Sequence, residues 1–283
     1  MTFRIMASRH SAFYSPLLCA IQFLREGGDE ATYRVLGAGQ RSYALLRDGE
    51  VDIVQSAVSS NWNPRERGVE PLPVHFAQIN QRDGFFLTTR QASPAFEWRQ
   101  LEGRMLLADH GQQPLAMLKY AVRHNGANWD KIEVVDAGSP ERMAAAFREG
   151  RGDYLHQQAP ITAGEVVVAV GSCVPPVAFS SLCASRQFIE TETFHRFVGA
   201  YAAARAWVQT APAAEVARAE AGFFPGHSQH ALEAAIGSYQ KLGCWEDGLE
   251  IPRNLYEQAL NVFETDGGLT RRFPYEEVCL PPR

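Results

Sequence analysis

Two histidines, His10 and His156, are the side chains of this 283-residue chain that are best placed for proton transfer. His10 follows a predicted strand at residues 3–6, and His156 ends a predicted strand at residues 153–156. An imidazole group can donate, accept or transfer a proton near neutral pH. Arg9, beside His10, adds a guanidinium group that can bind anionic or carbonyl oxygens. These residues are consistent with either a small-molecule binding site or an acid–base catalytic site.

A short pattern that occurs twice predicts how such residues are positioned. Residues 47–52 (RDGEVD) and 148–153 (REGRGD) each follow an apolar helix and precede a short strand. In each Gly-x-x-Asp copy, the glycine can end the helix in the left-handed conformation and the aspartate can hydrogen-bond backbone amides. The two copies are farther apart than the periods of about 20 to 50 residues found in solenoid repeats. The pattern therefore predicts two similar lobes, each with its own sheet.

Hydrophobic periodicity predicts strands and helices that alternate, as in mainly parallel sheets flanked by helices. Ligands of open α/β sheets bind outside the carboxyl ends of the strands, so polar loops from two such lobes would line one cleft. The predicted strands are residues 3–6, 32–36, 51–55, 74–80, 84–89, 101–108, 132–135, 153–156 and 166–170; the predicted helices are 16–25, 41–47, 115–124, 140–148, 193–209, 213–222, 230–242 and 254–263.

The chain is predicted to cross between the lobes twice, first in the loop at 91–94 and back again within 171–176. Lobe 1 would then comprise residues 1–90 and 175–283, including a helical C-terminal tail, and lobe 2 would comprise residues 91–174. The expected fold class is α/β, with a mixed, mainly parallel sheet in each lobe.

Composition narrows the class of protein. Hydrophobic residues make up 46% of the chain and charged residues 21%, as in ordinary globular domains. A net charge of -5 without a basic run argues against nucleic acid as a partner. No apolar run reaches the roughly 18 residues of a membrane-spanning helix. The cysteines form no Cys-x-x-Cys pair and no metal-ligand spacing with histidine, so neither a metal nor another cofactor is expected.

The first residues of the chain bear on the cellular compartment that we expect for the protein. Residues 2–7 read as a strand, with no charged leader or apolar signal region before it. As written, the chain is expected to be cytoplasmic. A trimmed or wrongly assigned start would instead make it periplasmic.

The order of these pieces resembles the type II periplasmic-binding-protein superfamily, and in particular its SsuA-like branch. The similarity is strongest at residues 44–53 (ALLRDGEVDI) and at 82–108, which contain GFFL and LEGR. That branch includes carriers of sulfonates, taurine, nitrate and thiamine-pyrimidine precursors. The resemblance implies two lobes that close over one small molecule. Such a protein would be the soluble component of an uptake system, with an ABC-transporter permease as a partner, or a cytoplasmic sensor derived from one.

The resemblance also implies which loops contact the ligand. Aromatic side chains among them could stack on a ring, and Arg9 and the amide side chains could bind anionic or carbonyl oxygens. We therefore expect a small organic ligand that is anionic or aromatic. The implied ligand-binding residues are Arg9, His10, Phe13, Tyr14, Gln40, Ser56, Ser59, Asn61, Trp62, Gly111, Gln112, Gln113, His156 and Gln157.

The alternative is a cytoplasmic enzyme on the same fold, because the superfamily also includes enzymes. It would use His10 or His156 for proton transfer on an aromatic or sulfur-containing substrate, which requires a second titratable group within hydrogen-bond reach. The binding hypothesis instead requires that Ser59 and Gln157 face one shared hollow.

Overall fold

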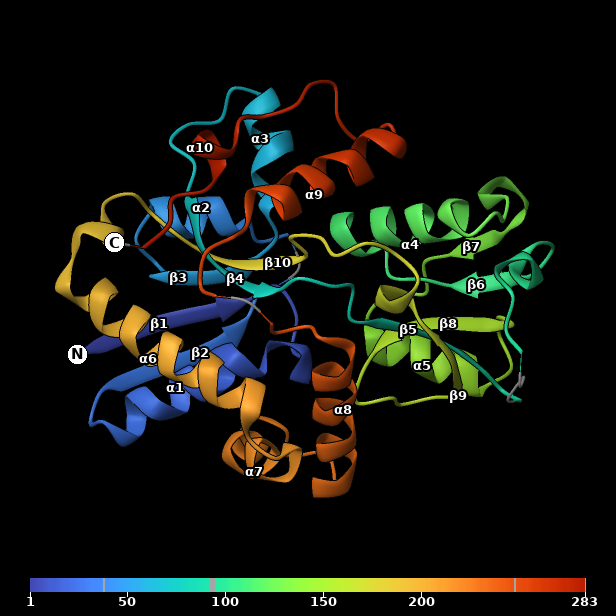
Figure 1. Ribbon diagram of the computed structural model, residues 1–283, viewed down its shortest axis with the longest axis horizontal. Helices are drawn as coiled ribbons and strands as arrows, with labels where there is room; N and C mark the ends of the chain where they lie inside the picture. The colour runs from blue at the N-terminus through green and yellow to red at the C-terminus, as the bar shows by residue number, and fades with distance from the viewer. Residues whose placement is uncertain (38, 92–94, 247, 283) are drawn as a thin grey trace.

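The computed structural model describes residues 1–37, 39–91, 95–246 and 248–282, and it contains two five-stranded sheets flanked by helices (Figure 1). We call the first sheet and the C-terminal helices lobe 1, and the second sheet with its helices lobe 2. In lobe 1 the strand order is β2 (Glu30–Val35), β1 (Thr2–Ala7), β3 (Ile53–Ser56), β10 (Ser180–Ala184) and β4 (Val74–Asn80). In lobe 2 it is β7 (Glu133–Val135), β6 (Met105–Leu107), β8 (Tyr154–Gln158), β5 (Phe85–Thr89) and β9 (Glu165–Ala169). The predicted α/β class is confirmed.

In lobe 1 the strands β2, β1 and β3 are parallel, and β10 runs antiparallel between β3 and β4. Helix α1 (Ser15–Glu26) connects β1 to β2, and α2 (Ser42–Arg47) connects β2 to β3. Pro16 lies in the first turn of α1, where its missing N–H leaves no hydrogen bond unmade. Because β1 and β3 are parallel neighbours, the loops that follow them meet at one edge. The amide of Ser8 donates to the carbonyl oxygen of Gln55 at 3.2 Å there.

Lobe 2 repeats this arrangement. Strands β7, β6 and β8 are parallel, and β5 runs antiparallel to both β8 and β9. Helices α4 (Gln112–His124) and α5 (Pro140–Arg148) make the connections. The loop after β6 and the end of β8 therefore share one edge of the second sheet, as the loops after β1 and β3 do in the first.

The two Gly-x-x-Asp junctions have the same structure in both lobes. Gly49 and Gly150 have φ angles of 67° and 100°, in the left-handed region that a side chain would disfavour. Asp52 accepts the backbone amide of Arg4 on β1 at 2.8 Å. Asp153 accepts the backbone amide of Met105 on β6 at 2.9 Å. Each aspartate thus fixes its own strand to the neighbouring strand, so these residues are structural.

Strand β5 belongs to lobe 2, whereas the sequence analysis assigned residues 84–89 to lobe 1. The chain crosses to the second sheet between β4 and β5, upstream of the predicted crossing at 91–94, where residues 92–94 lie outside the described part of the chain. An alternating apolar pattern identifies a strand but not the sheet it joins. The return lies between β9 and β10. The two crossings are packed together, because a Cβ on Gly171 would collide with the carbonyl oxygen of Asp83.

The C-terminal region is helical, as predicted, and it covers lobe 1. Helix α6 (Glu192–Thr210) packs against α1, and α9 (Arg253–Thr265) packs against α4 of lobe 2 (Figure 1). Across that second contact, Lys119 on α4 pairs with Asp266 at 2.9 Å. Among the described residues, no helix is long and apolar enough to cross a membrane. The remaining helices of lobe 1 are α3 (Trp62–Glu66), α6 (Glu192–Thr210), α7 (Ala213–Glu220), α8 (Gln229–Leu242), α9 (Arg253–Thr265) and α10 (Tyr275–Val278).

Candidate functional site

A cavity of about 690 Å³ lies where the carboxyl edges of the two sheets face each other. Lobe 1 contributes the loop after β1 and the segment after α7, and lobe 2 contributes the end of β8, the loop after β6 and the start of α5. This is the cleft that the repeated junction predicted. The residues that line the cavity include Ser8, Arg9, His10, Phe85, Asp109, Glu141, Arg148, His156, Gln157 and Gln158.

An ion pair between Arg9 and Asp109 joins the two lobes across this cavity. Asp109 follows β6, and its side chain is only 5% exposed, whereas that of Arg9 is 26% exposed. The backbone amide of Gly111 donates to the same carboxylate at 2.7 Å. A Cβ on Gly111 would collide with the guanidinium group of Arg9, so the glycine is needed for this close approach.

Neutral hydrogen bonds connect the lobes beside this ion pair. Ser59 Oγ donates to Gln113 Oε1 at 2.9 Å. The hydroxyl group of Tyr239 on α8 accepts the amide of Ala159 at 2.8 Å. Ser11 Oγ donates to the carbonyl oxygen of Ala159 at 3.2 Å. The lobes are therefore in direct contact around the cavity.

His156 is fully buried at the wall of the cavity, and neither of its ring nitrogens has a hydrogen-bond partner within the described part of the chain. Its ring stacks on Phe85 with centroids 4.2 Å apart and planes at 21°. Burial, together with the smaller effect of the charge of Arg9, lowers the pKa of His156 to about 3. The imidazole is consequently neutral at pH 7, with one donor and one acceptor unused. Unpaired buried polar atoms are costly and rare, and they indicate a ligand or a functional role.

Gln158, at the end of β8, presents a second unused group. Its Nε2 atom is buried and unpartnered among the described residues. Burial raises the pKa of the nearby Tyr14, and the side chains of Gln158 and Ser8 act in the opposite direction. Tyr14 is buried and is not part of the cavity wall.

His10 also lines the cavity, but both of its ring nitrogens are occupied. Nε2 lies 2.8 Å from the carbonyl oxygen of Phe223, so this nitrogen carries the proton and Nδ1 accepts the hydroxyl group of Tyr33 at 3.1 Å. The ring also stacks on Phe224 at 4.4 Å. Burial lowers the pKa of His10, although the bond to Phe223 opposes this. His10 thus anchors the loop after β1 to the segment after α7.

Trp62 does not line the cleft, contrary to its predicted role as an aromatic wall. Its side chain is 1% exposed and packs edge-on against Tyr256 and Phe263 of α9. Its Nε1 donates to the hydroxyl group of Tyr256 at 3.3 Å. The polar residues before Trp62 suggested that its side chain is exposed. However, the side chain of Asn61 donates a hydrogen bond to the carbonyl oxygen of Pro73 at 2.7 Å and so does not need water as a partner.

Other predicted residues have supporting positions. Phe13 is buried in the core, with Tyr239 at 5.0 Å and Gly84 directly against its ring. Gln157 lines the cavity, yet its amide is fully used on Thr88 and the 162–163 loop. Ser59, which was expected to face the same hollow as Gln157, instead bonds to Gln113 in the contact between the lobes, outside the cavity wall. The other predicted residues outside the wall are Asn61, Gly111, Gln40, whose side chain accepts the amide of Gly37, the buried strand residue Ser56, and Gln112, which is exposed at the start of α4.

Asp109 was not among the residues expected to bind the ligand. It lies two residues after the end of β6, so its place at the carboxyl edge of a sheet was a usable signal. Gln158 is the last residue of β8 and ends the polar stretch 156–158 that the sequence placed at the carboxyl edge of the second sheet.

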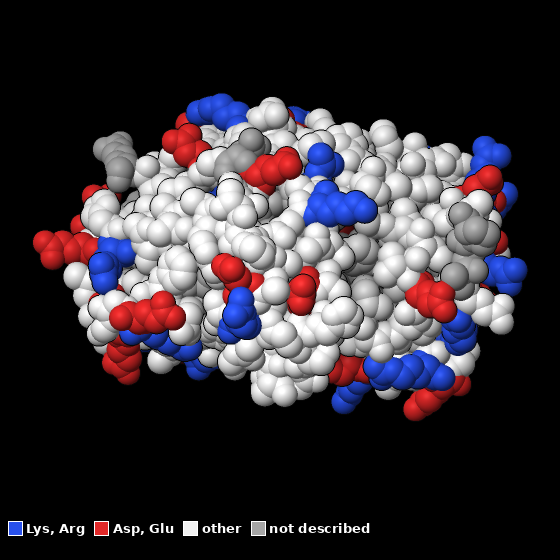
Figure 2. Space-filling model, turned by 60° about the horizontal axis from the view of Figure 1, so that its bottom comes forward, with Lys and Arg blue, Asp and Glu red and all other residues white. Residues whose placement is uncertain are grey.

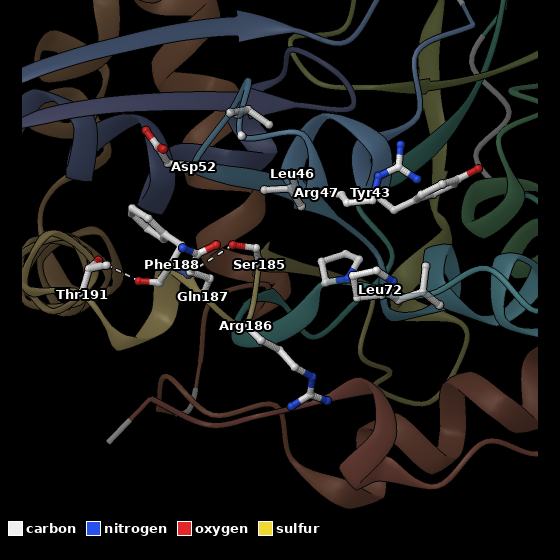
Figure 3. A pocket seen from close by; sticks show the side chains of 14 residues that line it. Tyr43, Leu46, Arg47, Asp52, Leu72, Ser185, Arg186, Gln187, Phe188 and Thr191 are labelled. Atoms are coloured by element: carbon white, nitrogen blue, oxygen red, sulfur yellow. Dashed lines mark hydrogen bonds between the residues drawn. The ribbon is translucent and has the colours of Figure 1, made fainter.

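A second hollow of about 480 Å³ lies in lobe 1 alone, at the opposite edge of the first sheet (Figure 3). Its polar groups bond to one another: Ser185 Oγ accepts the amide of Phe188 at 3.1 Å, and Thr191 Oγ1 donates to the carbonyl oxygen of Phe188 at 2.7 Å. Arg47 in its wall pairs with Asp48. Ser185, Thr191 and Arg47 of this hollow already have partners, and one lobe alone lines it, so the cleft is the better candidate site.

Other features of the surface are less specific. On the face shown in Figure 2, basic and acidic side chains are interspersed rather than gathered by sign. No group of three or more His, Cys, Asp or Glu side chains among the described residues could hold a metal ion.

The chain is similar in sequence to YtlA of Bacillus subtilis (strain 168), which carries the provisional description of a binding protein. The two are 23% identical over 282 residues, which covers 95% of this chain and 84% of YtlA. No protein-family model matches the chain.

Two solved structures are similar over nearly the whole chain. The ligand-binding component of an ABC-type import system from Staphylococcus aureus, with zinc bound, has a TM-score of 0.77 at 11% identity and covers 99% of this chain and 97% of its own. The periplasmic aliphatic sulphonate binding protein SsuA from Escherichia coli has a TM-score of 0.72 at 16% identity, covering 100% of this chain and 92% of its own. At these identities the similarity establishes a shared fold.

Proposed function

Since the chain has the fold of the type II periplasmic binding proteins, shared with SsuA-like solute-binding proteins, we propose that it is the solute-binding component of an ABC-type import system. It binds one small organic molecule in the cleft between its lobes. The observation that carries this proposal is His156, which is fully buried at the cavity wall with both ring nitrogens unpartnered in the described structure. A transporter permease is the expected partner.

Within this proposal, each lobe has a distinct part in binding. Lobe 2 supplies His156 and Gln158, whose free hydrogen-bonding groups face the ligand. Lobe 1 supplies the loop after β1, which carries Arg9 and His10. The ion pair of Arg9 with Asp109 and the bond of Ser59 to Gln113 hold the lobes together over the ligand.

The geometry favours binding over proton-transfer catalysis. His10 lies within hydrogen-bond distance of Tyr33, but both of its nitrogens are already used, and burial raises the pKa of Tyr33. His156 has free nitrogens, but no titratable side chain among the described residues bonds to it and orients it as a catalytic base requires.

The proposal is tested by thermal-shift screening of a library of small organic metabolites, followed by calorimetry on each hit. A ligand that binds only the folded state raises the melting temperature by mass action. The variant His156→Asn should reduce the response to a true ligand, whereas His230→Asn, on the exposed surface of α8, should leave it unchanged. A library without hits at millimolar concentration, or hits that are insensitive to His156→Asn, would contradict the proposal.

A further inference from the structure

The guanidinium group of Arg9 is not available as a free positive charge in the cleft. Asp109 neutralises it through two contacts between the guanidinium nitrogens and the carboxylate oxygens. This carboxylate is almost completely buried, so it has little access to water that could replace Arg9 as its partner. Arg9 taken alone suggests an anionic ligand, but Arg9 with Asp109 contributes no net charge.

The rest of the cavity wall is also balanced. Glu141 and Arg148 lie at its exposed rim, so the two arginines of the wall are matched by two carboxylates. Arg148 donates to the carbonyl oxygen of Thr162 at 2.6 Å, and Glu141 accepts the hydroxyl group of Ser139 at 2.7 Å. Neither Glu141 nor Arg148 is therefore needed to neutralise the buried pair of Arg9 and Asp109.

The buried groups of the wall that lack partners are all uncharged. His156 is neutral because burial lowers its pKa to about 3, and it offers one donor and one acceptor. Gln158 offers an N–H donor. A carboxamide-type group complements this set, since its carbonyl oxygen can accept from Gln158 or His156 and its N–H can donate to the remaining imidazole nitrogen.

We propose that the cleft selects an uncharged ligand that carries a carboxamide-type group, and that it discriminates against an anion of the same shape. This inference rests on the proposed binding function of the same cleft. An anion would either remain unpaired in a buried site or displace Asp109 from Arg9, and displacement would leave Asp109 as the unpaired charge. Both cost more than making hydrogen bonds between neutral groups.

The test uses probes of nearly the same shape that differ in the charge, and with it the donors and acceptors, of one planar group. Benzamide, benzoate and benzamidinium have nearly the same shape, and acetamide and 2-naphthamide with their acid and amidinium counterparts extend the set to smaller and larger sizes. Calorimetry at pH 7 measures each dissociation constant. We expect the amide of at least one set to bind about tenfold or more tightly than its carboxylate and amidinium counterparts.

A variant that removes the charge of Asp109 then tests whether the ion pair with Arg9 causes the preference for an uncharged ligand. Asp109→Asn keeps an oxygen that can accept the amide of Gly111 but releases the charge of Arg9, so carboxylate binding should strengthen about tenfold or more relative to the amide. Asp48→Asn is the matched control, because Asp48 pairs with Arg47 on the exposed surface of lobe 1. If Asp109→Asn does not fold, Arg9→Gln replaces it, and the preference should then move toward the amidinium probe.

The outcomes separate this inference from the proposed function. Wild-type protein that prefers a carboxylate, or a zwitterion such as β-alanine, over the amide would overturn the selection of an uncharged ligand and leave the binding function standing. An unchanged preference in Asp109→Asn, or in Arg9→Gln where that variant replaces it, would do the same. If no probe and no library compound binds, the binding function fails, and the inference fails with it.

Discussion

The side chains of Arg9 and Asp109, one from each lobe, form an ion pair packed against Gly111, the residue that precedes α4. Arg9 follows β1 and Asp109 follows β6, so the contact forms only when the carboxyl edges of the two sheets face each other. The pair therefore couples the closed arrangement of the lobes to the charge of the cavity.

Gly111→Ala should disrupt this contact. Gly111 has φ of -60°, which any residue can adopt, so an added methyl group acts by colliding with Arg9 rather than by straining the backbone. We expect the variant to lose about 1 kcal/mol or more of stability. Small-angle scattering should also show a larger radius of gyration, because the lobes separate.

Gly199→Ala is the control for this change. Gly199 lies inside α6, and nothing lies within 4 Å of a Cβ built there. Alanine in a helix interior should stabilise the protein by about 0.5 to 1 kcal/mol. Equal stability and equal dimensions in Gly111→Ala and wild type would show that Arg9 can bond to Asp109 from another position.

The stability of the protein should decline on both sides of a plateau between about pH 4.5 and pH 6.5. Burial lowers the pKa of His75 and of His156 to about 3, so the unfolded chain binds more protons than the folded chain below the ordinary value of 6.5. Taken alone, these histidines make stability fall as the pH falls from 6.5 toward 3.

Two buried carboxyl groups act in the opposite direction. Burial raises the pKa of Asp83 and of Glu220 to about 8, above their ordinary values of 3.8 and 4.5. The folded chain then binds more protons than the unfolded chain up to about pH 8, so stability falls as the pH rises through this range. The two effects cancel between about 4.5 and 6.5, and the carboxyl groups alone act from about 6.5 to 8.

Urea unfolding at a series of pH values measures this profile. Asp83→Asn and Glu220→Gln should each flatten the decline above pH 6.5, because each replaces a carboxyl group by an amide that does not titrate. Asp48→Asn, on the surface, should leave the decline in stability above pH 6.5 unchanged. If the stability of the wild-type protein instead increased from pH 6.5 to 8, the raised pKa values of Asp83 and Glu220 would be refuted.

Trp62→Phe should reduce stability and leave ligand affinity unchanged. The indole group packs on Tyr256 and Phe263 in the core, and its N–H bonds to Tyr256. Loss of that volume and of the hydrogen bond should cost about 2 kcal/mol in urea unfolding. Trp129→Phe, at a partly exposed position, should cost less. If Trp62→Phe bound the ligand more weakly without a change in stability, Trp62 would contact the ligand in the cleft as the sequence predicted.

The features that local sequence determines were predictable. The helix ends at Gly49 and Gly150 depend on nearby residues. The aspartates that follow accept backbone amides as the pattern indicated, although the neighbouring strands that supply those amides do not follow from the local sequence. The alternation of strands and helices, with the polar loops at the carboxyl edges, depends on periodicity within each segment.

The features that depend on how the lobes meet were not predictable from one sequence. The pairing of Arg9 with Asp109 joins residues that no local pattern connects. The membership of β5 in the second sheet depends on which partner strand is available. Trp62 was misplaced for the same reason, because the helix α9 that covers it lies far along the chain.

Replacement of His156 by leucine should make the protein more stable and unable to bind its ligand. Leucine can fill much of the space beside Phe85, and it removes two buried nitrogens that have no partner in the described structure. Relief of that penalty should raise the stability by about 1 kcal/mol. The same change removes the groups proposed to bond to the ligand. Natural binding sites commonly retain such unfavourable groups because they are satisfied only in the complex.

Urea unfolding and the thermal response to a ligand, measured on the same samples, separate this prediction from a purely structural role. If His156 served packing alone, His156→Leu would change stability and leave the ligand response intact. His230→Leu, on the exposed face of α8, should change neither quantity. A less stable His156→Leu variant would show that water or a protein group already satisfies the imidazole, and the strongest reason for placing the ligand beside it would be lost.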